Sequence, residues 1–145
     1  MNRNSNYYHI PMSDYGPEPF AVNLERAAIQ NQNYRTVLWT GQHLQLALMS
    51  IPVGGEIGLE VHPDTDQFIQ IVSGNAVTMM GHSEDRLNYQ RPLTEGYAVF
   101  VPAGTWHNIV NTGNIPLKLY TAYAPPQHPR GTVQSTKAVA DSEGY

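Results

Sequence analysis

Apolar and polar residues alternate in short runs over residues 34–124, and turn residues separate the runs. An alternation with a period of two is typical of strands that bury one face. Eight short strands at close spacing favour an antiparallel jelly roll or barrel, which is an all-β fold. The predicted strands are Arg35–Trp39, Leu44–Ile51, Glu56–Val61, Gln67–Ser73, Ala76–Met80, Tyr97–Val101, His107–Val110 and Leu117–Ala124.

The remaining segments lack this alternation and are predicted to be arms and loops. Residues 1–33 form an N-terminal arm over the surface or over a partner subunit, in which Phe20–Leu24 favours a short strand and Glu25–Asn33 one or two helical turns. Gly81–Thr94 is polar and charged, so we expect a loop there. The predicted organisation is therefore the arm 1–33, a barrel over 34–124 and a C-terminal segment over 125–145.

The C-terminal segment 125–145 begins with closely spaced prolines and ends in a polar tail. Proline lacks the backbone donor that a central strand needs, so this segment is expected to leave the sheet. Gly131–Tyr145 shows no clear periodicity and is predicted to be weakly structured.

Composition narrows the class of protein. The chain has 145 residues and fits one domain, and its net charge of −4 does not favour nucleic acid or an anionic membrane as a partner. It has no cysteine, which excludes disulfides, thiolate zinc sites and cysteine nucleophiles. Residues 1–6 show no apolar signal region, and no apolar run reaches the ~20 residues of a membrane helix. These features predict a cytoplasmic protein.

Two segments that open on glycine carry side chains able to bind a metal. The first is Gly54–Gly74, where Glu60 and His62 are two residues apart and therefore share one face of a strand, with Gln67 across the following turn. The second is Gly96–Asn111, which places His107 after a Pro-Ala-Gly turn. If these strands are neighbours, the four side chains converge in the interior.

These segments resemble the two motifs of the cupin superfamily, and the chain is similar to its small single-domain members. Gly54, position 60, His62, position 67 and Gly74 fall on the spacing of the first motif. The second motif is matched at all its fixed positions, which are Gly96, Pro102, Gly104, His107 and Asn111. The resemblance implies a cupin barrel with one metal bound inside it.

The first motif departs from the family pattern at two ligand positions, 60 and 67. Glu60 stands where the family has its first His, and Gln67 stands where it has Glu. The charge of the set is unchanged, because the carboxylate has moved to Glu60. If Gln67 only hydrogen-bonds, two His and one carboxylate remain, as in the facial triad of non-haem Fe(II) sites. The Glu-x-His-Pro segment also resembles the metal segment of phosphomannose isomerases.

We therefore predict one divalent metal ion, bound by Glu60, His62, Gln67 and His107. Mixed nitrogen and oxygen ligands suit Zn, Mn, Fe, Ni or Co, so its identity stays open. The alternative is a barrel without metal. An unpaired buried carboxylate is costly, and either a metal or a water-filled pocket would remove that cost at Glu60.

The sequence leaves the position or role of several polar residues open. Asp64 and Asp66 are expected to be solvated turn residues, with a general base as the alternative. Arg35 and Trp39 could reach the mouth of the barrel, and His128 either packs over that mouth or is exposed. Lys118 is expected to point outward, which leaves the interior without an obvious Lys or Arg. His9, His43 and His82 are expected at the surface, and the tyrosines Tyr97, Tyr120 and Tyr123 in the core or at the mouth.

The function that these features favour is a metal-dependent enzyme acting on a small polar substrate, either an oxygenase or a sugar isomerase. The alternatives are a non-catalytic protein that binds a metal and a small molecule, and a barrel with a vestigial site. No catalytic residue is assigned, and no dinucleotide or phosphate-binding motif is present. A homodimer is expected, because exposed strand edges need cover and cupins of this size commonly dimerise.

Overall fold

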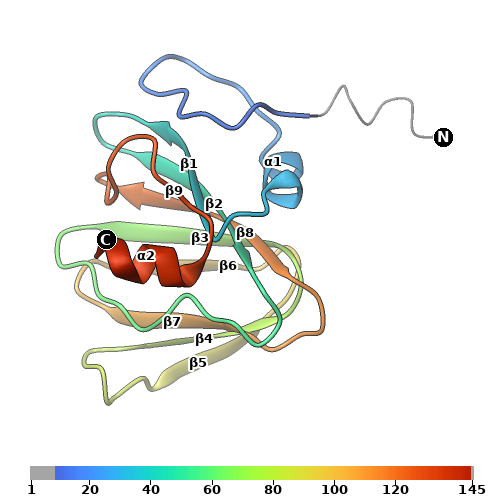
Figure 1. Cartoon of the computed structure of the whole chain (residues 1–145). Coiled ribbons are helices and arrows are strands. Elements are labelled where there is room, and N and C mark those ends of the chain that lie inside the picture. Colours follow the sequence, from blue (N-terminus) through green and yellow to red (C-terminus); the bar gives the residue numbers. More distant parts are fainter. Residues whose placement is uncertain (1–8, 145) are drawn as a thin grey trace.

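The computed structural model describes residues 9–144, and its strands form two antiparallel sheets that pack face to face (Figure 1). The larger sheet has the strand order β6-β3-β8-β2-β1-β9, and the smaller has β5-β4-β7. In chain order the elements are α1 (Leu24–Gln30), β1 (Arg35–Thr40), β2 (Gln45–Ile51), β3 (Asp66–Ser73), β4 (Ala76–Gly81), β5 (Tyr89–Leu93), β6 (Ala98–Val101), β7 (Trp106–Asn111), β8 (Leu117–Ala124), β9 (Val133–Gln134) and α2 (Lys137–Glu143). The all-β prediction is confirmed, but the sheets form a jelly-roll-like sandwich rather than a closed barrel.

The main core lies between the two sheets and follows from the alternation. In β8 the residues Leu117 and Leu119 are fully buried, while the residues between them are only partly buried. Ile69 and Ile71 of β3 extend the same inner layer, and Ile109 of β7 meets it from the smaller sheet. Each strand thus turns every second side chain inward, as the period of two predicts.

The outer face of the larger sheet is covered by α1 and the N-terminal segment. Ala27 and Ala28 of α1 are fully buried against Leu38 and Leu48 of the sheet. The helix begins at Leu24 because the Asn23 side chain accepts a hydrogen bond from the backbone of the first turn. The predicted strand Phe20–Leu24 is therefore wrong, whereas the predicted helical turns are present. Within the described residues, the arm lies over its own sheet.

The segment predicted as the strand Glu56–Val61 pairs with β7 at only two points. Glu56 bridges Val110, and Glu60 bridges His107. Gly58 lies between them with φ +101°, a conformation that interrupts a strand and that glycine adopts without strain. Its backbone N–H donates to the Asn108 side chain at 2.9 Å, so β7 itself holds the interruption in place.

Two regions predicted as irregular carry regular structure. The predicted loop Gly81–Thr94 contains β5, an edge strand bonded only to β4, where Pro92 is tolerated and most side chains are exposed. The tail Gly131–Tyr145 contains β9, which pairs with β1, and α2, which Thr136 caps. The prediction of a weakly structured tail is wrong over the described residues.

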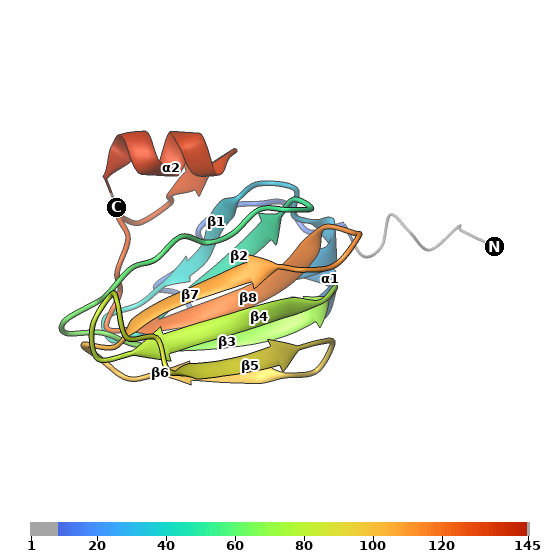
Figure 2. The same ribbon diagram turned by 90° about the horizontal axis from the view of Figure 1, so that it is seen from below.

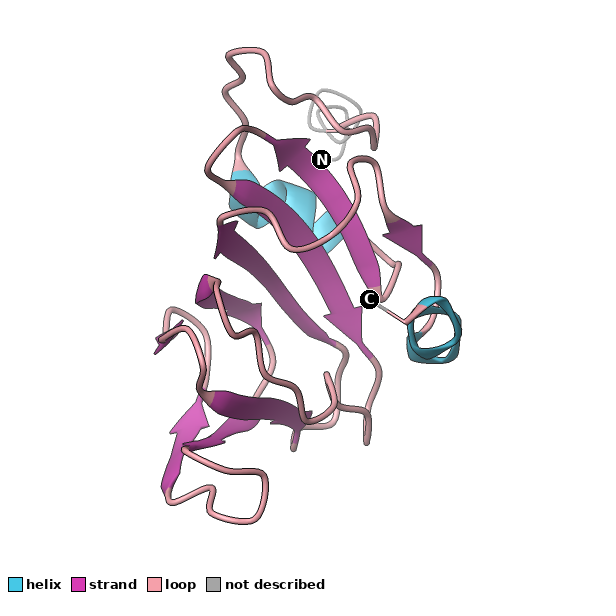
Figure 3. Cartoon of the chain, turned by 90° about the vertical axis from the view of Figure 1, so that its left-hand side faces the viewer, coloured by secondary structure: helices cyan, strands magenta, loops and turns pink. Residues whose placement is uncertain are grey.

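Helix α2 lies along one open side of the sandwich (Figures 1 and 2). Its Ala140 is 5% exposed and joins the inner core with Tyr34 and Ile57. The Tyr34 hydroxyl donates to the Ile57 carbonyl at 2.7 Å and so ties the start of β1 to the segment beside β7. Figure 3 shows α2 at the edge of the larger sheet and α1 against its outer face. Among residues 9–144, no helix is long and apolar enough to cross a membrane.

Candidate metal centre

Three potential metal ligands meet where the segment 56–62 runs beside β7. Glu60 and His107 exchange both backbone hydrogen bonds, at 3.0 and 2.9 Å. Residues paired in this way project their side chains to the same face, and His62 shares that face because it is two residues from Glu60. The ligand atoms of Glu60, His62 and His107 all lie within 4.8 Å of one another. The pairing register therefore builds the cluster that the two motifs predicted.

The ring of His107 is oriented for ligation. Its Nδ1 lies 3.0 Å from the Thr105 carbonyl oxygen, which can only accept, so Nδ1 carries the proton of the neutral ring. Its Nε2 faces Glu60 Oε1 at 3.4 Å but makes no hydrogen bond, although the residue is 1% exposed. A backbone carbonyl that fixes the distal nitrogen is common behind metal-ligating histidines.

Glu60 supplies the negative charge of the cluster. Its Oε1 lies 3.2 Å from His62 Nε2, and 30% of its side chain is exposed. Burial raises the pKa of this carboxyl, but its close contacts with the His107 and His62 rings outweigh that effect and hold the pKa well below its usual range. The group is therefore a carboxylate near neutral pH, as a ligand must be.

Gln67 lies on the facing sheet, at the start of β3. Its Nε2 donates to the Thr121 hydroxyl at 2.9 Å, which leaves the buried Oε1 without a partner. Gln67 pairs with Tyr123 in the sheet register, and the Tyr123 ring lies 6.0 Å from that of His62. The free amide oxygen thus belongs to the wall opposite the three ligands.

His128 packs over that wall, which is one of the two outcomes left open by the sequence. It is 7% exposed, and its ring lies 5.0 Å from the Tyr123 ring. The Gln45 side chain holds its backbone, accepting from the His128 N–H at 2.9 Å. Burial, reinforced by the charge of Arg35, lowers the pKa of His128 to about 3, so its ring is neutral.

Arg35 corrects the expectation that the interior lacks a cation. It is 3% exposed, and its Nη1 donates to Gln134 Oε1 at 2.5 Å. Arg35 pairs with Met49 in the sheet, so both side chains belong to the inner layer. The sequence allowed Arg35 to reach the mouth of the barrel but did not place it in the interior. Lys118 lies outside this inner layer, as expected, and its Nζ donates to the Asn31 carbonyl at 2.6 Å.

The other polar residues have structural or surface roles. Asp66 Oδ1 accepts from the Ala103 N–H at 2.9 Å and so pins the second turn, while Asp64 is exposed. The surface predictions for His9, His43 and His82 are confirmed. Asn108, which the sequence did not single out, also bonds the Glu56 carboxylate at 2.8 Å and thereby positions the segment that carries Glu60.

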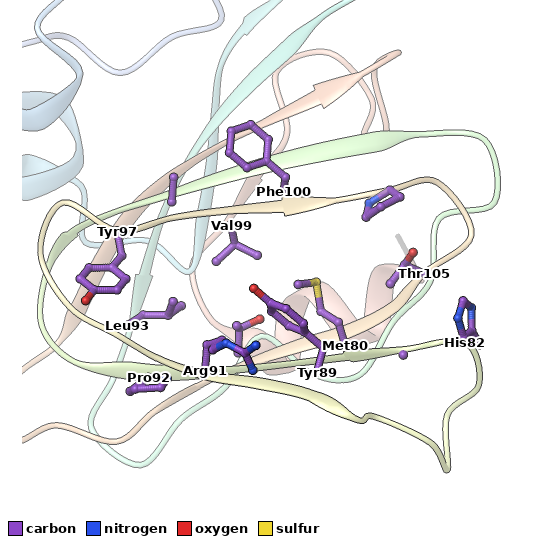
Figure 4. Close-up of a pocket in the computed structure, with 14 residues that line it drawn as sticks. Met80, His82, Tyr89, Arg91, Pro92, Leu93, Tyr97, Val99, Phe100 and Thr105 are labelled. Carbon is purple, nitrogen blue, oxygen red and sulfur yellow. The ribbon is translucent and has the colours of Figure 1, made fainter.

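Two cavities flank the centre. A cleft of about 700 Å³ opens between β5 and β6, and Figure 4 shows Met80, Tyr97 and Val99 among its lining residues. None of the three clustered ligands lines it. A recess of about 250 Å³ is smaller but is lined by Glu60 and Arg35, with Asp141 of α2 at its side. We assign the chemistry to the recess because, unlike the cleft, it is lined by a member of the cluster, Glu60.

Comparison with known proteins agrees with this geometry. A family model described as the cupin domain matches residues 47–123. The chain is 57% identical over 132 residues to YrkC of Bacillus subtilis, covering 91% of this chain and 71% of that protein. It is 40% identical over 126 residues to a protein of Acanthamoeba polyphaga mimivirus, covering 86% and 77%. The crystal structure of BH2720 from Bacillus halodurans is similar with a TM-score of 0.89 and 55% identity, covering 90% of this chain and 98% of that one.

Proposed function

This chain belongs to the cupin family, and from that premise we propose that it is a metal-dependent enzyme acting on a small polar molecule in its interior. The observation that carries the proposal is the cluster of Glu60, His62 and His107, whose ligand atoms lie within 4.8 Å of one another. The buried and unbonded Nε2 of His107 is costly without a partner, and a divalent ion would satisfy it.

Glu60, His62 and His107 would hold the metal, with one negative charge from Glu60. Gln67 offers its free amide oxygen as a fourth donor or as an acceptor for the substrate. The bound ion would polarise a substrate oxygen or activate O2. The protein's own contribution is to fix the His107 ring through Thr105 and to keep Glu60 ionised beside two imidazoles.

Oxygenation is favoured over isomerisation. Two His and one carboxylate form the donor set typical of non-haem Fe(II) oxygenases. Isomerisation needs a base beside the metal, but of the two aspartates weighed for that role Asp64 is an exposed turn residue and Asp66 bonds the Ala103 N–H. Burial lowers the pKa of His128 to about 3, which makes it a weak base at neutral pH. Among the ions considered, Fe(II) is therefore the first to test.

Oxygen consumption tests this function. Protein loaded anaerobically with Fe(II), Mn, Co, Ni or Zn is exposed to air with a panel of small organic acids and sugars. We expect consumption that depends on Fe(II) and on one substrate class, that is lost in Glu60→Gln and is retained in Asp64→Asn, an exposed carboxylate of the next turn. Loaded protein that binds a panel member but turns over none would support the non-catalytic alternative and contradict an enzyme.

Assembly as a homodimer and a cytoplasmic location remain proposals. Phe100 is 70% exposed and its ring contacts that of Phe68 on the neighbouring strand in a tilted arrangement, with 5.1 Å between ring centroids. An exposed aromatic pair on the edge strand β6 suits an interface with a second copy. Light scattering at micromolar concentration should give a dimer that Phe100→Asp converts to a monomer. A wild-type monomer would contradict the assembly.

A further inference from the structure

The buried polar atoms that lack a hydrogen bond gather around the metal centre. In the described residues they are His107 Nε2 and, beyond that ligand, Arg35 Nε, Gln67 Oε1, Tyr123 Oη and both ring nitrogens of His128. Native proteins bond nearly all buried polar atoms, and each unbonded one costs about 1–3 kcal/mol. A group of unbonded atoms in one place therefore indicates a missing partner rather than an error of packing.

The sheet register explains why these atoms face the ligands. Tyr123 pairs with both Gln67 and Gln45, so these three side chains form one inner row of the larger sheet. Tyr123 then contacts His62 on one side and His128 on the other, with ring centroids 6.0 and 5.0 Å apart. Arg35 enters the same interior from β1. The metal ligands form one wall, and this polar row forms the other.

Arg35 lacks a matched counter-ion in this interior. Within the described residues, no carboxylate lies within salt-bridge distance of its guanidinium. Its contacts include the neutral Gln134 amide, the Tyr123 side chain and the Tyr34 ring, whose centroid is 5.1 Å from Cζ. Two carboxylates, Glu60 and Asp141, line the same recess, and Asp141 is already paired with Lys137 at 2.9 Å. Leaving a buried charge without a partner is costly.

Metal binding would make this imbalance larger. A divalent ion with Glu60 and two neutral histidines carries a net charge of about +1, and Arg35 adds another. The interior would then favour an anion. A guanidinium binds a carboxylate with two parallel hydrogen bonds, and the buried Tyr123 hydroxyl, which lacks a hydrogen-bond partner, can donate a third.

Resting on the metal site proposed above, we propose that Arg35, Tyr123 and His128 bind the carboxylate of a small organic acid whose neighbouring oxygen faces the metal position. Arg35 and Glu60 line the recess of about 250 Å³, whose size suits an acid of a few heavy atoms, and Tyr123 and His128 belong to the buried polar row that Arg35 adjoins. The size of the recess does not favour a phosphosugar. The substrate class is thus a 2-hydroxy or 2-oxo carboxylate, held between the polar row and the three ligands.

Calorimetry with Zn-loaded protein tests this binding without any turnover. The probes are lactate, propanoate, which lacks the second oxygen, and inorganic phosphate. We expect lactate to bind at least tenfold more tightly than either other probe. Equal binding of phosphate, equal binding of propanoate or no binding of lactate would overturn the inference.

Variants assign the binding to the named residues. Arg35→Met keeps the length of the side chain but removes the charge, and it should weaken lactate at least tenfold while the zinc content stays at the wild-type level. Arg91→Met, on an exposed residue of the larger cleft, is the matched control and should bind lactate normally. If Arg35→Met does not fold, Tyr123→Phe replaces it, with an expected weakening of threefold or more.

The two proposals fail in different ways. Wild-type protein that binds no zinc when zinc is supplied would contradict the metal centre. Normal zinc content with lactate affinity unchanged by both Arg35→Met and Tyr123→Phe would overturn the carboxylate site alone. Loss of lactate binding in Arg91→Met would move the site to the larger cleft and would also overturn it.

Discussion

The two ends of the sandwich interior are built by the same strands and differ in chemistry. On β8, Tyr123 faces the metal centre, whereas Leu119 lies in the apolar core. On β3 the corresponding pair is Gln67 and Ile71, and on β7 it is His107 and Ile109. The side chains of the apolar end pack against one another, whereas several buried polar atoms of the polar end have no hydrogen-bond partner. Stability is concentrated at one end and binding capacity at the other.

Removing packing at the apolar end should have the largest effect on stability. Leu119 is 0% exposed, and Leu119→Ala should lower the free energy of unfolding by about 2–5 kcal/mol through lost contacts and a cavity. Denaturant unfolding measures this. Ile115→Ala, at a residue 47% exposed, is the control and should change stability by less than about 0.5 kcal/mol. Loss of metal from folded Leu119→Ala would contradict a division between the two ends.

Removing the charge of the cluster should act on metal and not on packing. Glu60→Gln keeps the shape of the side chain but removes the carboxylate ligand, and we expect metal affinity to fall about 100-fold, which corresponds to about 2.7 kcal/mol. Competition with a chelating dye measures the affinity. Asp64→Asn should bind as the wild type does. An unchanged affinity in Glu60→Gln would move the site away from the cluster.

The neutral His128 predicts a pH dependence of the apo protein. Burial lowers its folded pKa to about 3, so below its unfolded value of about 6.5 only the unfolded chain takes up this proton. Stability is therefore lost as the pH falls, by about 2 kcal/mol between pH 6.5 and 5 from this residue. His128→Gln should lack that part of the slope, whereas His43→Gln, at the surface, should keep it. Identical slopes in the wild type and His128→Gln would show that this ring is not held neutral.

The smallest effect is expected at Gln67, on the border between the two ends. Gln67→Met conserves volume and loses one hydrogen bond to Thr121, so stability should change by less than about 1.5 kcal/mol. Metal affinity should fall by about tenfold or less, since Gln67 stands on the opposite wall and would be at most a fourth donor. A fall as large as that of Glu60→Gln would make Gln67 a principal ligand.

The sequence predicted most of this fold because alternation and glycine spacing are local signals. It predicted the clustering of Glu60, His62 and His107, since the motif spacing reflects the pairing register between two segments. It missed α2, which gains stability from packing of Ala140 on Tyr34 and Ile57, and β9, which is held by its pairing with β1, rather than by their own sequence patterns. It allowed Arg35 to reach the mouth but did not predict a cation in the interior, because burying a charge is costly unless the site that uses the charge is known.

The metal centre depends on Glu60, His62 and His107 binding one divalent ion. Anomalous diffraction, recorded on both sides of the absorption edge of the metal found in protein purified without added metal, can locate that ion. We expect one peak about 2.0–2.2 Å from a Glu60 oxygen and from the Nε2 atoms of His62 and His107. We also expect the peak to be absent from Glu60→Gln. A strong peak elsewhere, or metal-free protein that takes up no ion when one is supplied, would contradict this metal centre.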